Sequence, residues 1–522
     1  MSGTLIRGGT VIDGTGAAPR VTDVRIAGDQ ITAVGRLPAQ PGDTVVDANG
    51  SWVTPGFIDV HTHMDGWLVK TPLIASKLRQ GFTTEIIMSD GISYAPVSRQ
   101  NAGEWIYYLK GLNALQQEDY ANWESIADFM SLVDGRNAQN ALAQVPYANV
   151  RVLACGWGQS APDDYQTLEI QDRIAQAMEE GACGLSTGLD YVAQCWADTD
   201  ELVRAAEAIA GFGGIYATHV RYKHGTLAGM QEAVRIGLQS GAKVHISHLK
   251  GNSEQERDQL LEYIDNKAVH EVDFTFDVYP YLPGSTMLNY LMPYEAWRNG
   301  PLGVMSALTS RRLRDGVTQA AASSRLELDS MVIAWVPGKG NTCWQGATLQ
   351  AYVDASGKPA GDALCDFLIE ENLAVLLVFH RGADELADAF LQHPCFLLGT
   401  DGILHPGGHV HPRQYGSAPR MLDTLIARGV LSLEQAVHSM TGRSADRFGL
   451  RNRGRIAEGC FADLLVIDPQ RFKERNGFDN PVVLAEGLDH MWVNGQPVIS
   501  SGRLMDSTGD RFPGRALRYQ PT

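Results

Sequence analysis

The sequence lacks the cysteine pattern of a disulfide-stabilised protein and the long apolar runs of a membrane protein. Its seven cysteines are scattered over 522 residues without a C-x-x-C pair, and a free thiol in an apolar run packs as a small hydrophobic group. No apolar stretch is long enough to span a bilayer. The N-terminus shows no basic segment followed by the apolar core of a signal peptide. We therefore expect a cytoplasmic globular protein without a membrane partner.

The sequence is also poor in positive charge. It has 43 lysines and arginines against 60 aspartates and glutamates, a formal net charge of −17. Such a charge argues against nucleic acid and anionic membranes as partners, so we expect a small-molecule substrate. No G-x-S-x-G sequence lies on a strand-to-helix turn, and no G-x-x-x-x-G-K-[ST] sequence occurs. Residues Gly184–Gly188 have the form G-x-S-x-G, but they fall inside the predicted strand that ends at Leu189, so neither the nucleophile elbow of serine hydrolases nor the P-loop of nucleotide hydrolases is indicated.

The two ends of the chain share a β-rich texture. Residues 1–52 read as short strands separated by Gly, Asp and Asn turns, and a similar pattern returns at 462–468 and 490–498. A chain of this length usually forms more than one structural unit. We expect residues 1–54 and 455–522 to build one small β-sandwich, with residues 55–454 forming a second domain.

Between the two ends, short apolar runs alternate with helical segments, the pattern of an α/β protein with a parallel sheet. We expect a (β/α)8 TIM-type barrel. Its predicted strands end at His63, Asp90, Trp157, Leu189, His219, His248, Tyr279 and Asp401. Two further apolar runs, Met331–Val336 and Leu373–His380, leave open which run is the seventh strand. The region 281–346, rich in Gly, Pro and aromatic residues, is expected to form an inserted lid over the site.

Histidines and carboxylates occur where these predicted strands end. His61 and His63 follow an apolar run, and side chains at i and i+2 of a strand point to the same side. His219, His248 and Asp401 lie at three further strand ends. A barrel brings the carboxyl ends of its strands around one mouth, and imidazole and carboxylate groups are ordinary zinc ligands. The combination predicts a metal site there.

This order of residues resembles the amidohydrolase superfamily, and most closely its D-aminoacylase (N-acyl-D-amino acid deacylase) branch. The stretches that carry the closer resemblance are Gly181–Tyr191, Thr218–Arg221, Ser247–Lys250, Asp277–Tyr281, His411–Arg413 and Phe512–Arg518. The resemblance covers nearly the whole chain, and it too implies a barrel flanked by a β-sandwich.

The resemblance implies roles for the ligand candidates. His219 and His248 would hold a tightly bound zinc ion, and His61, His63 and Asp401 would line a second, often weaker position, so one or two Zn²⁺ per chain are expected. Family members carry a cysteine ligand where this sequence has Asp90. A carboxylate is a harder ligand with two oxygens that could bridge two ions, so we expect Asp90 to remain a ligand and the second metal position to be occupied more readily than in cysteine-bearing relatives; whether Asp90 bridges stays open, and the alternative is a residue that only supports the ligands or the turn.

The same resemblance implies how catalysis and binding are divided. Asp401 would accept a proton from the attacking water and return it to the departing amine, while zinc supplies activated water at neutral pH. A free substrate carboxylate would be bound by Tyr191, Lys250 and Arg413, with Ser285 as a weaker candidate. Trp157 stands where relatives usually carry a histidine, which bears on the pocket for the acyl or leaving group.

The sequence thus predicts a zinc-dependent hydrolase that cleaves the amide of an N-acyl-D-amino acid or a related carboxylate-bearing amide. One alternative keeps the site and changes the substrate to a lactam, cyclic imide, carbamate or D-dipeptide. A second alternative is a non-catalytic scaffold that works by assembly. Stereochemical preference and the number of metal ions stay open, and a homo-oligomer is compatible with the sequence.

Overall fold

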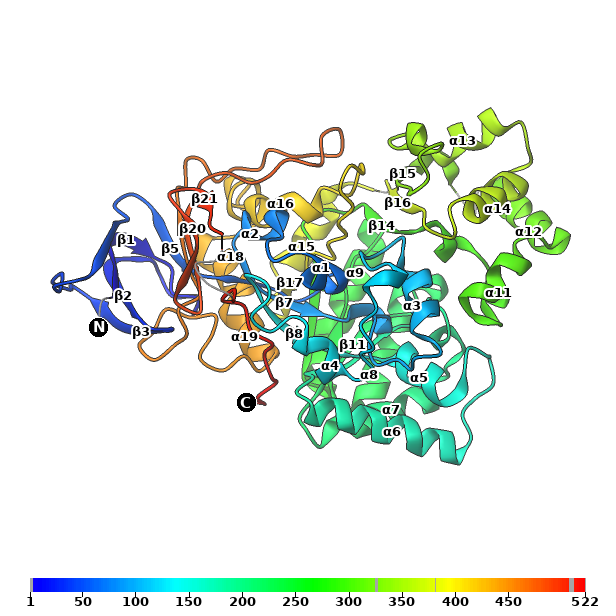
Figure 1. Ribbon diagram of the computed structural model, residues 1–522, viewed down its shortest axis with the longest axis horizontal. Coiled ribbons are helices and arrows are strands. Elements are labelled where there is room, and N and C mark those ends of the chain that lie inside the picture. The colour runs from blue at the N-terminus through cyan, green and yellow to red at the C-terminus, as the bar shows by residue number, and fades with distance from the viewer. Residues whose placement is uncertain (1–2, 324–326, 381, 507–510, 522) are drawn as a thin grey trace.

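The computed structural model describes the chain except residues 1–2, 324–326, 381, 507–510 and 522. At its centre lies a barrel of parallel strands surrounded by helices (Figure 1). The strands are β6 (Phe57–Asp59), β7 (Phe82–Ile87), β8 (Asn140–Ala143) continued by β9 (Val145–Pro146), β10 (Gly184–Gly188), β11 (Ile215–His219), β12 (Lys243–Ile246), β13 (Phe274–Val278) and β17 (Phe396–Leu398). Each pairs in parallel with its neighbour. The ring closes where the backbone N–H of Val60 donates to Leu398 at 3.3 Å. The predicted eight-stranded barrel is therefore present.

The barrel strands are almost fully buried and the connecting helices are amphipathic, as both faces of a parallel sheet require. The main helices of the barrel are α1 (Asp65–Lys70), α3 (Ala102–Leu109), α4 (Ile126–Ser131), α5 (Tyr147–Cys155), α6 (Asp164–Glu179), α7 (Thr199–Ala210), α8 (Thr226–Ser240), α9 (Glu254–Tyr263), α16 (Arg413–Leu422), α18 (Leu433–Met440) and α19 (Gly442–Arg447). Among the residues described, no helix has the length and apolar character needed to cross a membrane.

The predicted third strand, ending at Trp157, is wrong. Residues Tyr147–Cys155 form helix α5, and the third barrel position is taken by β8 and β9 earlier in the chain. A continuous apolar run fits a buried strand and a buried helix equally well. Arg151, in the middle of this run, is fully buried, and its charge is compensated by Glu201 of α7, which accepts a hydrogen bond from Arg151 Nε at 2.7 Å.

The two extra apolar runs are not barrel strands either. They form β15 (Met331–Trp335) and β16 (Leu376–Phe379), which pair antiparallel and join β14 (Gly284–Met287) in a separate three-stranded sheet. With α11 (Gly300–Ala307), α12 (Arg311–Ala322), α13 (Leu349–Ser356) and α14 (Ala360–Glu370), this sheet makes an insertion between β13 and β17, at the upper right of Figure 1. The insertion therefore continues past residue 346, the end expected for the lid, because β16 completes its sheet.

Both ends of the chain meet in one nine-stranded sheet, at the left of Figure 1. Its strands are β1 (Thr4–Val11), β2 (Arg20–Ala27), β3 (Gln30–Gly35), β4 (Thr44–Asp47), β5 (Trp52–Pro55), β18 (Leu464–Ile467), β19 (Leu488–Val493), β20 (Gln496–Ser500) and β21 (Arg503–Leu504). The two halves join where β18 pairs with β5, and they share a small core that includes Ile6, Val53 and Trp492. Farther along, the tail leaves this sheet and lies against β8, where Leu517 donates to Ala141 at 2.8 Å.

Candidate metal centre

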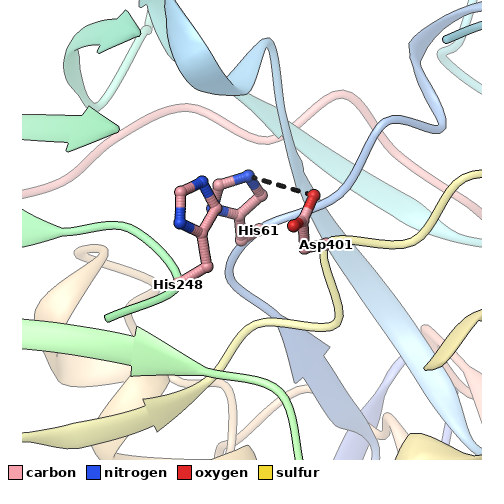
Figure 2. A group of neighbouring side chains, drawn as sticks. All are labelled: His61, His248 and Asp401. Atoms are coloured by element: carbon pink, nitrogen blue, oxygen red, sulfur yellow. Dashed lines mark ion pairs between the residues drawn. The ribbon is translucent and has the colours of Figure 1, made fainter. Parts of the chain in front are cut away.

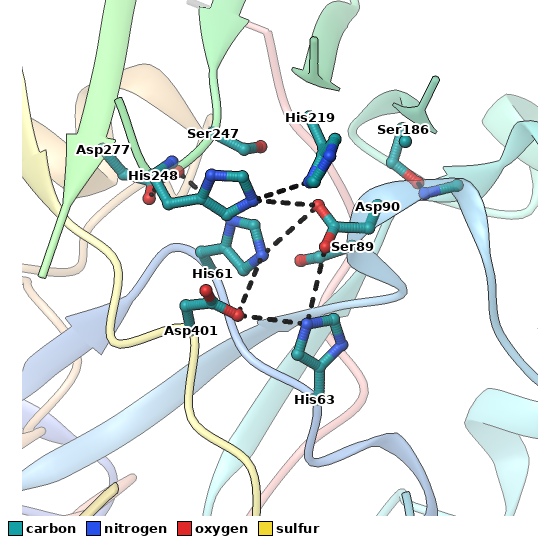
Figure 3. Close-up of polar contacts among 12 residues, drawn as sticks. His61, His63, Ser89, Asp90, Ser186, His219, Ser247, His248, Asp277 and Asp401 are labelled. Carbon is teal, nitrogen blue, oxygen red and sulfur yellow. Dashed lines mark hydrogen bonds and ion pairs between the residues drawn. The ribbon is translucent and has the colours of Figure 1, made fainter. Parts of the chain in front are cut away.

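Six polar side chains meet at one mouth of the barrel, at the carboxyl ends of five strands (Figure 3). They are His61 and His63 after β6, Asp90 after β7, His219 at the end of β11, His248 after β12 and Asp401 after β17. None is more than 8% exposed. These are the six residues that the sequence predicts as metal ligands, and the structure brings all of them together.

Three of the six have a backbone conformation that L-residues avoid. The φ angles of Asp90, His248 and Asp401 are 57°, 38° and 49°. Residues held in the left-handed region cost of order 1 kcal/mol or more each and concentrate at functional sites. The strand ends therefore turn sharply here, and each turn directs a nitrogen or oxygen donor toward a common centre.

Asp90 lies between two sets of histidines. Its Oδ1 is 3.5 Å from His61 Nε2 and 3.7 Å from His248 Nε2, and its Oδ2 is 3.6 Å from His63 Nε2. Asp401 Oδ1 closes the other side, 3.2 Å from His63 Nε2. Three overlapping groups of ligand atoms result, each within 4.8 Å: His61, His248 and Asp401 (Figure 2); His61, His63 and Asp90; and Asp90, His219 and His248.

Two atoms of this cluster indicate which kind of ligand the site can bind. Among the residues described, His61 Nε2 and Asp90 Oδ1 are buried without a hydrogen-bond partner. Leaving a buried polar atom unpaired costs about 1–3 kcal/mol, and both atoms face the centre of the cluster. The donors are imidazole nitrogens and carboxylate oxygens only, a set that suits zinc and other divalent transition metals. The residues present therefore fit a bound metal.

Two further carboxylates orient the rings of His61 and His219. Asp277, on β13, lies with its Oδ2 3.4 Å from His61 Nδ1 and its Oδ1 2.8 Å from the backbone nitrogen of His248. Asp190, just after β10, lies 3.3 Å from His219 Nε2. A metal-binding histidine usually donates its second ring nitrogen to such a partner, which sets the tautomer. The other nitrogens, His61 Nε2 and His219 Nδ1, are left to face the centre.

The electrostatic surroundings keep the two central carboxylates ionised. Burial alone would raise the pKa of Asp401, but the Arg413 guanidinium, with Nη1 2.8 Å from Asp401 Oδ2, and the neighbouring histidines together outweigh burial and lower that pKa below its usual range. Burial would likewise raise the pKa of Asp90, but His61 and His248 together outweigh burial and lower that pKa below its usual range. Both groups are therefore charged at neutral pH, as ligation requires.

A cavity of about 1470 Å³ opens directly onto the cluster. Its wall includes Asp90, His219, His248 and Asp401 on the barrel side, and residues of the insertion opposite them. This volume exceeds that of a typical small-ligand site, roughly 300–1,000 Å³. The candidate ligands are thus accessible to a small molecule although each is nearly buried.

Three of the four residues predicted to bind the substrate line this cavity: Tyr191, Lys250 and Ser285. Lys250 Nζ donates to Tyr279 Oη at 2.7 Å and to the Leu282 carbonyl at 3.2 Å, and no carboxylate among the residues described pairs with it. Ser285 Oγ donates to the Leu377 carbonyl at 2.7 Å. A partly buried ammonium group that has no anionic partner is suited to binding an anionic ligand.

Arg413, the fourth, does not line the cavity. It is fully buried behind the wall, 4.4 Å from the ring of Tyr279, and its Nη2 donates to the Ser285 carbonyl at 3.3 Å. Its guanidinium also pairs with Asp401. The structure thus gives Arg413 a partner that the sequence did not indicate, and its role in binding substrate stays a prediction.

Trp157 also lies outside the cavity wall. Its ring packs against Trp105 with centroids 4.8 Å apart, and its Nε1 donates to Glu104. A side chain at Gly300, the first residue of α11, would collide with it at 2.6 Å. Trp157 therefore packs against the start of α11 in the insertion. None of these contacts supports the expectation that Trp157 reshapes the acyl or leaving-group pocket.

Known proteins are similar to this chain both in sequence and in architecture. A family model for the amidohydrolase family matches residues 44–272 and 390–499. The chain belongs to the amidohydrolase family. The D-aminoacylase of Alcaligenes xylosoxydans xylosoxydans is 31% identical over 500 residues, 95% of this chain and 94% of the relative. The N-acyl-D-aspartate deacylase of the same organism is 29% identical over 524 residues, covering 98% and 94%.

Among solved structures, the N-acyl-D-glutamate deacylase of Bordetella bronchiseptica, complexed with zinc and a phosphonate inhibitor, matches this amidohydrolase with a TM-score of 0.83. It is 29% identical, and the match covers 99% of each chain. These relatives confirm the predicted D-aminoacylase branch and the fold class. The stretch of this chain between the two matched ranges, residues 273–389, contains β13 and the whole insertion.

The sequence did not reveal the orienting roles of Asp190 and Asp277. Both lie in stretches that carry the family resemblance, and Asp277 interrupts an apolar strand in the same way as the ligands do. That interruption was the available signal. It could not separate a ligand from a residue that orients a ligand, because both need a polar side chain near a strand end.

Proposed function

We propose that this amidohydrolase is a zinc-dependent hydrolase that cleaves the amide bond of an N-acyl-D-amino acid. The observation that carries the proposal is the six-donor cluster at the floor of a cavity that also presents Lys250. The proteins it resembles over nearly their full length are named as D-aminoacylase and as deacylases of N-acyl-D-aspartate and N-acyl-D-glutamate.

The proposed ligands form two positions that share Asp90. His219 and His248 with Asp90 would hold one ion, and His61 and His63 with Asp90 the other, with Asp401 beside the second. When bound, zinc lowers the pKa of water and polarises a carbonyl group. The contribution of the protein is a rigid donor set, fixed by Asp277 and Asp190 and partly removed from solvent.

Asp401 is the proposed general base and acid. Its Oδ1 faces the histidines and the cavity, while Oδ2 is held by Arg413. An ionised carboxylate can take the proton of the attacking water through Oδ1 and return it to the departing nitrogen. The Arg413 pair keeps that carboxylate ionised and prevents it from rotating away.

We assign substrate anchoring to the wall of the cavity. Lys250 would attract the free carboxylate as a point charge, and the hydroxyls of Tyr191 and Ser285 lie on the same wall, with Arg413 directly behind Ser285. A carboxylate held at this wall places the neighbouring amide over the metal ligands. The proposed partner is therefore a small molecule that carries a free carboxylate.

The test is a paired measurement of metal content and hydrolysis on freshly purified protein. N-acetyl-D-amino acids with acidic and apolar side chains are compared with their L-enantiomers and with a panel of lactams and cyclic imides. Zinc together with D-selective release of the amino acid supports the proposal. Zinc with activity only on lactams or imides would keep the metal chemistry and replace the substrate class, and protein without bound metal after zinc reconstitution would refute the proposal.

A further inference from the structure

Asp190 connects the metal centre to the wall of the substrate cavity. On one side its Oδ2 lies 3.3 Å from His219 Nε2. On the other side its carboxylate accepts two hydrogen bonds from the insertion, from Tyr294 Oη to Oδ1 at 2.6 Å and from Tyr290 Oη to Oδ2 at 3.2 Å. Asp190 is only 3% exposed, so these contacts satisfy a carboxylate that solvent hardly reaches.

The two tyrosines belong to the insertion and line the cavity. Tyr290 lies in the short helix η6 (Leu288–Leu291) and Tyr294 in η7 (Tyr294–Trp297). Lys223 reinforces the contact from the barrel side, because its backbone N–H donates to Asp190 Oδ2 and its Nζ donates to the Tyr290 carbonyl at 2.8 Å. The Lys223 ammonium also lies 4.2 Å and 4.7 Å from the two tyrosine rings.

The tyrosines can act only as donors in this arrangement. Burial, and then the nearby Asp190 carboxylate, raise the pKa of both phenols above their usual range, so both remain protonated at neutral pH. Donation from the phenols and from His219 Nε2–H fixes the plane of the carboxylate. His219 is thereby held in the tautomer that leaves Nδ1, 3.1 Å from His248 Nε2, free to face the metal position.

We propose that Tyr290 and Tyr294 are positioning residues, which act through Asp190 to hold His219 in its metal-binding orientation. The wall that contacts the substrate and one metal position are then a single hydrogen-bonded unit. A change in the insertion that alters substrate preference would also alter metal affinity. This inference rests on the proposed function as a metal-dependent hydrolase, and its test measures metal binding without turnover.

The experiment is a double-mutant cycle on zinc affinity. Metal-free wild type, Tyr294→Phe, Asp190→Ala and the double variant are titrated with zinc in competition with a chromophoric chelator. Removing a partner that orients a ligand typically costs 10–100-fold in metal affinity. We expect about a tenfold loss for Tyr294→Phe at one of the two positions, a smaller loss for Tyr290→Phe with its longer hydrogen bond, and no further loss when Tyr294→Phe is added to Asp190→Ala.

Tyr352→Phe is the matched control, because this tyrosine of α13 also belongs to the insertion and no hydrogen bond of its hydroxyl is found among the residues described. It should bind zinc as wild type does. Wild-type zinc affinity in both Tyr290→Phe and Tyr294→Phe would overturn the inference and leave the proposed function intact. Equal losses from Tyr294→Phe in both backgrounds would also overturn it, because the tyrosine would then not act through Asp190. Failure of wild type itself to bind zinc would refute the proposed function instead.

Discussion

Asp90 offers the sharpest perturbation of the metal centre, because it belongs to two of the three ligand groups. Oδ1 faces His61 and His248, and Oδ2 faces His63. The substitution Asp90→Asn keeps the shape and one oxygen, but it removes the charge and turns an NH₂ group toward one set of histidines. An amide nitrogen is not a zinc ligand, so one position loses its shared donor entirely while the other keeps a neutral oxygen.

The size of the effect follows from this geometry. Removing a residue that only orients a ligand typically costs 10–100-fold in metal affinity, which is about 1.4–2.8 kcal/mol. Loss of a direct ligand should cost at least the upper end of that range. We therefore expect Asp90→Asn to lose one ion completely, to bind the other at least about 100-fold more weakly, and to lose activity in proportion.

The assay is zinc titration of the metal-free protein, together with elemental analysis of the protein as purified. Asp446→Asn is the control, since this exposed carboxylate pairs with Arg455 far from the centre. Unchanged stoichiometry and affinity in Asp90→Asn would refute the reasoning, and would make Asp90 a residue that only shapes the turn after β7.

Three further predictions test the base, the anchor and the buried charges. Asp401→Asn should retain the zinc held by His219, His248 and Asp90 and lower kcat by roughly 10²–10⁴-fold, because an amide cannot accept the proton of water; near-normal kcat with normal metal content would remove Asp401 from the proton transfer. Lys250→Met should raise KM roughly 10–100-fold for an N-acyl amino acid, the worth of a charged hydrogen bond, and far less for its methyl ester; equal changes would contradict anchoring by charge. Burial raises the pKa of Glu85 to about 7, against the opposing effect of Lys77, so the folded protein binds this proton more tightly than the unfolded chain and loses stability as pH rises from about 4.3 to 7. Urea unfolding at pH 5 and pH 8 should show a larger loss for wild type than for Glu85→Gln, and identical losses would show that Glu85 does not titrate in this range.

The grouping of the six candidate ligands could be predicted from the sequence because each of them lies at or just after the end of a strand of the predicted parallel barrel. An apolar run that ends in His61 and His63, or in His219, places the imidazoles at the mouth of a barrel whatever the exact register. The third strand could not be predicted in this way. Tyr147–Cys155 carries no alternation to separate helix from strand, and the carboxylate that pairs with its buried Arg151 belongs to Glu201, which is distant in sequence.

The orienting carboxylates escaped prediction for a different reason. In the sequence, Asp190 and Asp277 look like further ligand candidates. Only the structure shows that each faces the histidine ring nitrogen that points away from the centre of the cluster. The ion pair between Arg413 and Asp401 escaped prediction for the same reason. Arg413 follows Asp401 by twelve positions, and an arginine predicted near the cavity is equally expected to face the substrate. Such roles depend on which atoms lie within hydrogen-bond distance of each other in the folded protein, and spacing along the chain does not encode this.

The six candidate ligands and one part of the cavity wall lie in different parts of this chain. All six ligand candidates lie within the ranges that the amidohydrolase family model matches, whereas Ser285, Tyr290 and Tyr294 lie in the unmatched insertion. Membership of the family therefore supports the reaction more strongly than it supports any one substrate. Because Tyr290 and Tyr294 also contact Asp190, a change in the insertion can alter both the substrate and the affinity for zinc. Substrate screens should accordingly be run at saturating metal, since a variant with weakened zinc binding would otherwise be mistaken for one with altered specificity.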